Sequence, residues 1–210
     1  QFLPLLTNVY PDTGQYMYWY DPISFTFTGQ MDLDSYTEGV ILESNQRGVL
    51  EYEAEFIQDN ETAQLIITPV ENYYADEQIQ ISINQELRDI WNNPFDGNGN
   101  GDPDGIADED SILFTVNLLG DYDRSSLVDF EDLITLQQYW WDETLTLSGE
   151  IGPAVGTPPF MQIQPDSKMD FEDLMIFVQM WNWSTGFDYD GGRIARSRQV
   201  EENYTTLSAS

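Results

Sequence analysis

Along the first 118 residues, hydrophobic and polar positions alternate in short runs, and turn-forming residues separate the runs. A period of two is typical of strands that bury one face, and no sustained helical period competes with it here. The runs are FLPLLTNVYP, PISFTFTG, GVILESN, GVLEYEAEFI, TAQLIITPV, EQIQISINQEL and SILFTVNLL. Seven strands at this spacing predict an immunoglobulin-type β-sandwich over residues 1–118, without an inter-sheet disulfide because the chain has no cysteine.

From residue 119 onward the pattern becomes helical. The stretches VDFEDLITLQQYWW and MDFEDLMIFVQMWNW align without gaps, with apolar residues at helical spacing in both. Four equivalent pairs are expected to form one shared core: Phe130/Phe171, Leu133/Leu174, Leu136/Phe177 and Trp140/Trp181. A Gly/Pro/Thr-rich connector, residues 144–159, lies between the two helices. The pattern therefore predicts a mainly β protein with a small α module at residues 119–185.

Oxygen-bearing residues at alternating positions precede the first helix. In GDYDRSSLVDFEDL, residues 120–133, relative positions 1, 3, 5, 9 and 12 are Asp121, Asp123, Ser125, Asp129 and Asp132. A calcium loop of the EF-hand type takes ligands from those positions and from the backbone carbonyl of position 7, here that of Leu127. Asp129 also suits the start of a helix. The spacing predicts a calcium site; the alternative is an acidic turn that caps a helix.

The helix-starting sequence DFEDL returns 41 residues later, at residues 170–174. Counting back from Asp170 and Asp173 as positions 9 and 12 gives the candidates at positions 1, 3 and 5, which are Gln162, Gln164 and Asp166. Two amides in place of two carboxylates reduce the charge of the loop and weaken calcium binding. Two alternatives stay open: Glu150 reaches in across the connector, or the repeat has lost its ion.

A third candidate site is the glycine-rich stretch DGNGNGDPDGIADED, residues 96–110, which carries six acids and no base. It contains two overlapping frames in which oxygen-bearing residues alternate and are followed by glycine and then aspartate. The first frame consists of Asp96, Asn98, Asn100, Gly101 and Asp104. The second consists of Asn100, Asp102, Asp104, Gly105 and Asp108, with Ile106 as a further candidate. Without a cation the loop repels itself, so we expect calcium here; the alternative is a flexible acidic loop.

Composition narrows the range of partners and chemistries. The net charge of −31, from 38 acids and seven bases, disfavours nucleic acid and anionic membranes as partners. A solubilising surface or adaptation to high salt would scatter the acids, whereas here many are clustered at ligand spacing. The absence of histidine and cysteine excludes Cys/His zinc sites and His-dependent catalysis. No apolar run is long enough to span a membrane, and Gln1 followed by strand-like sequence indicates a processed N-terminus or a piece of a longer protein.

The paired loop–helix motif resembles a dockerin, the small module that binds a cohesin in bacterial assemblies. The resemblance rests on the first loop, with aspartate at its twelfth position, and on the repeated DFEDL. The stretches ISFTFTGQMD, residues 23–32, and LRDIWNNPFDGNG, residues 87–99, resemble Ig-like modules of bacterial surface proteins. Together these resemblances imply a non-catalytic bacterial protein of the cell surface or extracellular space. It would bind two or more Ca²⁺ ions and serve adhesion or assembly with a cohesin-like partner.

Two other functions stay open. The first is a self-assembling surface or filament subunit, in which residues 186–210, with Arg193, Arg196 and Arg198, add a strand to another copy. The second is a carbohydrate-binding module, since the aromatic cluster YMYWY at residues 16–20 could stack on sugars, although core packing explains it as well. A carboxylate pair could do acid–base work, but in so acidic a chain such a pair carries no information, and we expect no enzyme activity.

Overall fold

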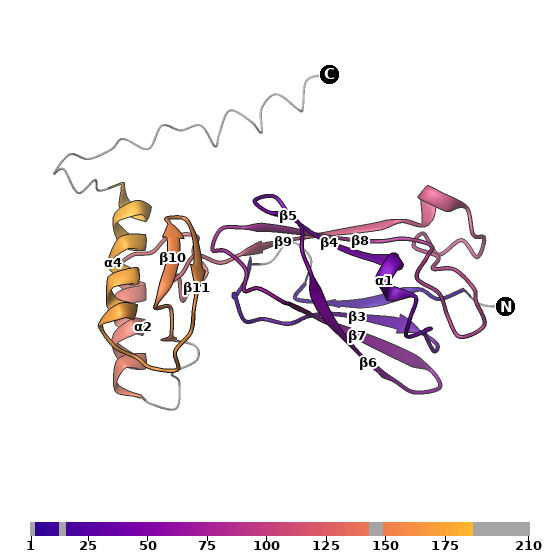
Figure 1. The fold of residues 1–210 in the computed structure, drawn as a ribbon, viewed down its shortest axis with the longest axis horizontal. Helices are drawn as coiled ribbons and strands as arrows, with labels where there is room; N and C mark the ends of the chain where they lie inside the picture. The colour runs from indigo at the N-terminus through magenta and orange to yellow at the C-terminus, as the bar shows by residue number, and fades with distance from the viewer. Residues whose placement is uncertain (1–2, 13–15, 143–148, 187–210) are drawn as a thin grey trace, which may run out of the picture.

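A computed structural model describes residues 3–12, 16–142 and 149–186 of the chain. Figure 1 shows two sheets packed face to face at one end of an elongated molecule and two helices with a β-hairpin at the other. The protein is thus mainly β with a small helical part, as the pattern of hydrophobic positions predicts. No helix of the described residues is long and apolar enough to cross a membrane.

The first sheet contains four antiparallel strands in the order β1-β3-β7-β6. Their bounds are Leu6–Tyr10 for β1, Ile23–Thr28 for β3, Thr62–Pro69 for β7 and Tyr52–Gln58 for β6. Three of these strands lie inside one of the seven runs predicted from the sequence, and β6 extends one residue beyond its run, to Gln58. The strands β1 and β6 form the two edges of this sheet.

The second sheet has the order β2-β9-β8-β4-β5, and only its β2–β9 pair is parallel within the described residues. Its strands are β2 (Tyr16–Met17), β9 (Asp110–Val116), β8 (Gln78–Ile83), β4 (Val40–Ser44) and β5 (Gly48–Val49). A short helix, α1 (Tyr36–Gly39), precedes β4, and a 3₁₀ turn, η1 (Gly105–Asp108), precedes β9. The sequence pattern did not reveal β2 or α1.

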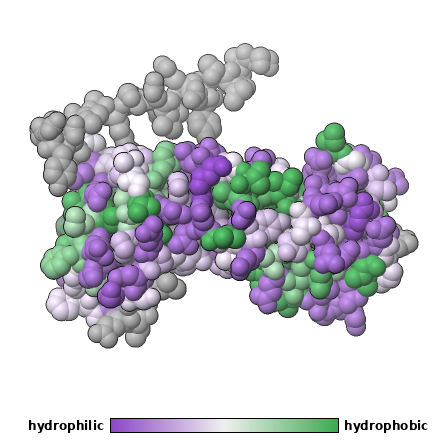
Figure 2. All heavy atoms as spheres, in the orientation of Figure 1, coloured by the Kyte–Doolittle hydropathy of each residue, from purple (hydrophilic) through white to green (hydrophobic). Residues whose placement is uncertain are grey.

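The core of the sandwich lies between the two sheets. Strand β8 shows the rule: Ile79, Ile81 and Ile83 are buried, whereas Gln78 and Gln80 are exposed. Each such side chain contributes roughly 1.5–3 kcal/mol when it leaves water, so the alternation fixes which face of the strand turns inward. The outer surface mixes hydrophilic and apolar areas, and one of the apolar patches lies over β4 and β5 (Figure 2).

The loop that follows β8 is held by one buried aspartate. Asp89 accepts hydrogen bonds from the backbone N–H groups of Trp91 at 2.9 Å and Asn93 at 2.8 Å. Its second oxygen accepts from the Asn93 side chain at 2.6 Å. These contacts explain why aspartate and asparagine stand four residues apart in LRDIWNNP. They also carry the chain from β8 to Phe95, which is buried in the sandwich core.

The helical part consists of α2 (Phe130–Trp141), α4 (Phe171–Thr185) and a hairpin of β10 (Ala154–Thr157) and β11 (Phe160–Ile163). It has its own core, in which Leu136, Phe177 and Met180 are buried. The hairpin lies in and just after the stretch that the composition marks as a connector. Gly/Pro/Thr richness does not distinguish a two-strand hairpin from an irregular connection.

The predicted helical core is correct for the pair Leu136/Phe177 and wrong for Phe130/Phe171, and in the pair Leu133/Leu174 the first residue is exposed. Leu136 and Phe177 are buried, and Leu174 and Trp181 pack against the same core. Phe130 and Phe171, however, are 60% and 73% exposed. Both follow directly after the N-cap aspartate of their helix. The ring of Phe171 still lies 6.0 Å from that of Trp140 on the facing helix, so contact with that helix does not bury it.

Candidate metal centre

The first loop brings the predicted carboxylates together in front of α2. Asp121, Asp123 and Asp132 each have an oxygen within 4.8 Å of the others. Asp132 accepts hydrogen bonds from the backbone N–H of Tyr122 at 2.7 Å and from that of Asp129 at 3.0 Å. It therefore closes the loop from the first turn of the helix, as expected for position 12 of a calcium loop.

The remaining predicted ligands lie on the same loop. Asp121 accepts from the N–H of Ser125 at 3.0 Å and from that of Ser126 at 2.8 Å, which winds the chain around its carboxylate. The hydroxyl of Ser125 donates to the carbonyl of Leu127 at 3.3 Å, so these two ligand candidates are neighbours. Asp129 is the N-cap of α2 and accepts from the N–H of Glu131.

Burial raises the free energy of this cluster when its carboxyl groups are ionised. Asp121 is 1% exposed and Asp132 is 0% exposed. Burial raises the pKa of Asp121 to about 7, and the nearby carboxylate of Asp132 adds to the increase. The pKa of Asp132 is raised too, mainly by burial. A divalent cation would remove this cost, because its positive charge would balance the negative charges of the buried carboxylates.

The second repeat has the same closure, built from different residues. Asp173 accepts from the N–H groups of Ile151 at 2.8 Å and Gly152 at 2.9 Å, as Asp132 does from Tyr122 and Asp123. The buried Glu150 accepts from the N–H of Ser167 at 2.7 Å and so takes the place of Asp121. Glu150 thus reaches across the connector to the second loop, as one of the two alternatives predicts.

The continuous loop predicted from Gln162 to Asp173 is therefore corrected. Hairpin β10–β11 interrupts the loop, and the N–H of Gln164 closes the base of the hairpin by donating to the carbonyl of Pro153 at 2.8 Å. Gln162 lies within β11 and turns toward the sandwich, while Gln164 is exposed. Glycine at position 152 is required because a Cβ there would lie 2.6 Å from the backbone of Glu172. The place of Asp123 thus has no carboxylate in the second repeat.

A basic side chain also distinguishes the second loop. Lys168 donates from Nζ to Asp166 at 2.7 Å, and this hydrogen bond lowers the pKa of the Asp166 carboxyl. Asp166, Asp170 and Glu172 bring one oxygen each within 4.8 Å of one another, but all three are at least partly exposed. Asp170 caps α4 as Asp129 caps α2. An ion at this loop would have to compete with Lys168 for Asp166.

The acidic loop at residues 96–110 combines members of both predicted frames. The buried Asp96 accepts from the N–H groups of Gly99 and Gly101, both at 2.8 Å. The side chains of Asn98 and Asn100 reach Asp104 at 3.2 and 3.0 Å. These contacts gather the residues of the first frame around Asp104.

Asp108 links this group to the sandwich. One of its oxygens accepts from the N–H of Asp104 at 2.8 Å and from the side chain of Gln85 at 2.7 Å. Among the described residues none donates to its other oxygen, although Asp108 is fully buried. An orphaned buried oxygen beside carboxylates and amides fits a hard cation. The carbonyl of Ile106 accepts from the N–H of Glu109 in the 3₁₀ turn, and Asp102 is exposed, so both stay predicted ligands.

The first loop is also part of the junction between the sandwich and the helical part. The Tyr18 hydroxyl donates to the carbonyl of Tyr122 at 3.0 Å, and Arg124 lies over the Tyr18 ring at 4.5 Å. The Arg124 guanidinium also lies 3.9 Å from the carboxylate of Asp21, so the basic side chain of this loop faces the sandwich. The buried side chain of Asn117 donates to the carbonyl of Asp121. Ordering this loop would therefore order the junction.

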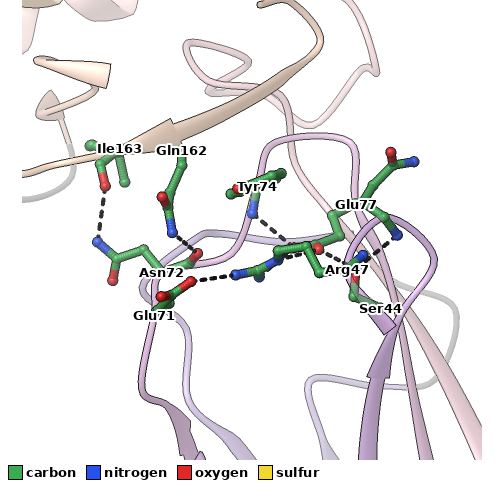
Figure 3. Close-up of polar contacts among 9 residues, drawn as sticks. Ser44, Arg47, Glu71, Asn72, Tyr74, Glu77, Gln162 and Ile163 are labelled. Atoms are coloured by element: carbon green, nitrogen blue, oxygen red, sulfur yellow. Dashed lines mark hydrogen bonds and ion pairs between the residues drawn. The ribbon is translucent and has the colours of Figure 1, made fainter. Parts of the chain in front are cut away.

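Hairpin β10–β11 makes the second half of the junction (Figure 3). The side chain of Gln162 donates to the carbonyl of Asn72 at 2.9 Å, and the side chain of Asn72 donates to that of Ile163 at 3.1 Å. Next to it the N–H of Ala75 donates to the carbonyl of Met161 at 2.9 Å. The β7–β8 loop thus pairs with β11 across the junction.

A buried ion pair supports that loop from the sandwich side (Figure 3). Glu77 is fully buried and receives Arg47 through two nitrogens, at 2.8 and 2.9 Å. Glu77 also accepts from the N–H of Tyr74 at 2.8 Å and from the hydroxyl of Ser44. The pair fixes the end of the loop that carries Asn72 and Tyr74.

The aromatic cluster of residues 16–20 lies at the same junction. Trp19 packs partly buried against both hydrophobic cores, and Tyr18 stacks on Tyr20 with ring centroids 5.4 Å apart. Arg124 covers one face of the Tyr18 ring, so this ring is not open to a sugar on that face. Their role in the structure is to join the two parts.

The sequence alone did not indicate the roles of Lys168, Asn117 and Asn72 at the second loop and the junction. For Glu150 a signal was present: Gly149-Glu150 repeats the Gly120-Asp121 that opens the first loop. The residues of the junction had no such signal, since their partners are distant in sequence.

Comparison with known proteins gives little beyond this description. No family model matches the chain, and no curated protein matches it. Among solved structures, the surface layer protein SbsC, domains 1–6, is similar with a TM-score of 0.36 and 14% identity. The match covers 55% of this chain and 14% of that one, so this chain spans a small part of that protein's length. A likeness of this size assigns no function.

Proposed function

We propose that this chain is a non-catalytic, calcium-stabilised module of the bacterial cell surface or extracellular space, which serves adhesion or protein assembly. The observation that carries the proposal is the first loop, where Asp121, Asp123 and Asp132 bring their oxygens within 4.8 Å of one another. Two of these carboxylates are buried. Arg124, a basic residue of this loop, points toward Asp21 and lies over the ring of Tyr18.

Calcium is the ion that the donor set fits. The candidates are carboxylates, a serine hydroxyl and a backbone carbonyl at EF-hand spacing, which are hard oxygen ligands. The chain has no histidine or cysteine, so the nitrogen and sulfur ligands that zinc and the softer transition metals favour are missing. The loop at residues 96–108 offers a second oxygen-rich site, and the second repeat, with Lys168, a weaker third.

The role of the ion would be structural. Extracellular calcium modules bind with dissociation constants of about 10⁻⁴–10⁻³ M. A site at about 100 times its dissociation constant adds roughly 2.7 kcal/mol to the free energy of unfolding. Since the first loop contacts Tyr18 and Asn117, calcium there would hold the sandwich and the helices as one rigid unit.

Exposed apolar side chains on the helices support a protein partner. Phe130 and Ile134 on α2 are exposed, and so are Phe171 and Met175 at the equivalent positions of α4. Large apolar side chains that recur on an exposed face are typical of interaction sites. By the dockerin resemblance the partner would be cohesin-like; other copies of this chain are the alternative.

Calorimetric calcium titration of the chelator-treated full chain tests the proposal. We expect binding in the wild type and a loss of one binding event in Asp121→Asn. The matched control is Glu131→Gln, which removes an exposed acid from the first turn of α2, close to the loop. No calcium binding by the wild type at millimolar calcium would overturn the proposal, as would equal binding by both variants.

A further inference from the structure

The edges of the two sheets differ in how well they are protected. Edges β2 and β5 have two residues each, and β1 carries a register shift between Leu6 and Asn8. Short strands and bulges keep sheet edges from pairing with other chains. Strand β6 has neither protection, since its seven residues pair with β7 in unbroken register and include no proline. Among the described strands, β6 is the one long regular edge.

The two faces of β6 have different chemistry. Glu53, Glu55 and Ile57 are exposed on the outer face, and Glu51 directly precedes the strand. Ala54 and Phe56 lie on the inner face and pack partly buried against the sandwich core. A strand that joins this edge therefore needs positive charge on one face and small or apolar side chains on the other.

Within residues 193–200, RIARSRQV, positions 195–198 carry that pattern, whereas Arg193 falls on the same face as Ala195. Arg193, Arg196 and Arg198 are three of the seven bases of the chain, and these residues lie outside the described part. The described residues hold 33 acids and four bases, so this segment is the strongest basic cluster in the sequence. In an extended chain Arg196 and Arg198 share one face, and Ala195 and Ser197 share the other.

We propose that residues 193–200 of a second copy of this chain add as a strand to the free edge of β6. Arg196 and Arg198 would lie beside Glu53 and Glu55, because both pairs have the two-residue spacing of one strand face. Ala195 and Ser197 would lie over Ala54 and Phe56. Backbone hydrogen bonds along the edge give such strand addition its affinity, and the side-chain pairs give it selectivity.

The position of the helices favours a second copy over the chain's own edge. In Figure 1, β6 forms one border of the sandwich, and hairpin β10–β11 lies between α4 and the sandwich. Residues 187–192 are six residues and span at most about 21 Å when fully extended. A helix with its side chains is already about 10 Å across, so this length is largely used in passing the helical part. A neighbouring copy has no such limit.

A charge-swap experiment on the full chain tests the inference. Wild type, Glu53→Arg/Glu55→Arg and Arg196→Glu/Arg198→Glu are compared by light scattering over a concentration series. We expect the wild type to form multiples of its 24.2 kDa mass and each double variant to stay monomeric. Mixing the two double variants should restore assembly, since each then offers the charge that the other lacks. Glu43→Arg/Glu109→Arg is the matched control, with the same charge change at exposed positions in or next to the other sheet, and should assemble like the wild type.

Three outcomes would overturn the inference. The first is a wild-type chain that is monomeric at every concentration. The second is that Arg196→Glu/Arg198→Glu abolishes assembly whereas Glu53→Arg/Glu55→Arg does not. That result would place the acceptor edge elsewhere. The third is two double variants that fail to assemble when mixed. The inference deepens the assembly part of the proposed function and is independent of its calcium part. Repeating the series with calcium and with chelator separates a failure of one from a failure of the other.

Discussion

The side chain of Gln162 donates to the backbone carbonyl of Asn72 at 2.9 Å and so ties the β10–β11 hairpin to the sandwich. The two residues are 90 positions apart in the chain. Gln162 is thus a junction residue where the sequence spacing indicated a calcium ligand. A hydrogen bond between two structural parts, unlike an ion ligand, affects stability without affecting metal binding.

We expect Gln162→Ala to lower the free energy of unfolding by about 1 kcal/mol, because the Asn72 carbonyl loses its donor at a partly buried site. Urea unfolding measures the change. The control is Gln164→Ala, which truncates an exposed side chain and should change stability by less than about 0.5 kcal/mol. Calcium titrations of both variants should match the wild type. Reduced calcium binding in Gln162→Ala would restore its predicted role as a ligand.

Stability without metal should depend on pH through Asp121. Burial raises the pKa of this carboxyl to about 7, whereas an unfolded aspartate has a pKa of about 3.9. The folded state therefore holds the proton more tightly, and the metal-free protein loses stability as the pH rises from about 4 to about 7. Calcium competes with this proton, so calcium affinity should increase over the same pH window.

Thermal unfolding of the chelator-treated protein across this pH range measures the effect. General repulsion among the many acids also lowers stability as the pH rises, so the informative quantity is the difference between wild type and Asp121→Asn. We expect the variant to show a weaker pH dependence, since it has no proton to lose at this site. Identical pH profiles would contradict the raised pKa of Asp121.

Lys168 should control the calcium affinity of the second loop. Its ammonium group donates to Asp166 at 2.7 Å, and the equivalent position in the first loop is Leu127. We expect Lys168→Leu to strengthen calcium binding or to add a binding event in calorimetry, because Asp166 no longer has an internal cation. Lys168→Arg keeps the charge and is the matched control. Equal titrations of the two variants would show that Asp166 takes no part in binding an ion.

The pair of Arg47 and Glu77 should be important for the stability of the sandwich. Glu77 is fully buried, and Arg47→Ala would leave its charge without a basic partner. We expect a loss of about 3 kcal/mol, the lower end of the range for a broken buried pair, because Tyr74 and Ser44 still donate to Glu77. Arg88→Ala breaks an exposed pair with Glu86 and should cost less than about 1 kcal/mol. Similar urea midpoints for the two variants would contradict this.

The sequence by itself determined most of the strands and the first loop. Strand β8 could be predicted because burying alternate isoleucines is a local rule that holds wherever one sheet face is covered. The first loop could be predicted because its ligand candidates and the cap of α2 lie within 12 consecutive residues, from Asp121 to Asp132. Neither depends on which distant segment packs nearby.

Only the tertiary structure decided the rest. Glu150 replaces a predicted glutamine because a hairpin interrupts the second loop, and this hairpin is stable where it pairs with the loop around Asn72. Phe130 and Phe171 have the helical spacing of core residues, yet they are exposed, even though Phe171 lies beside Trp140 of the facing helix. Spacing along a chain says which side chains share a face. The contacts of that face depend on packing between segments far apart in sequence, and periodicity contains no information about them.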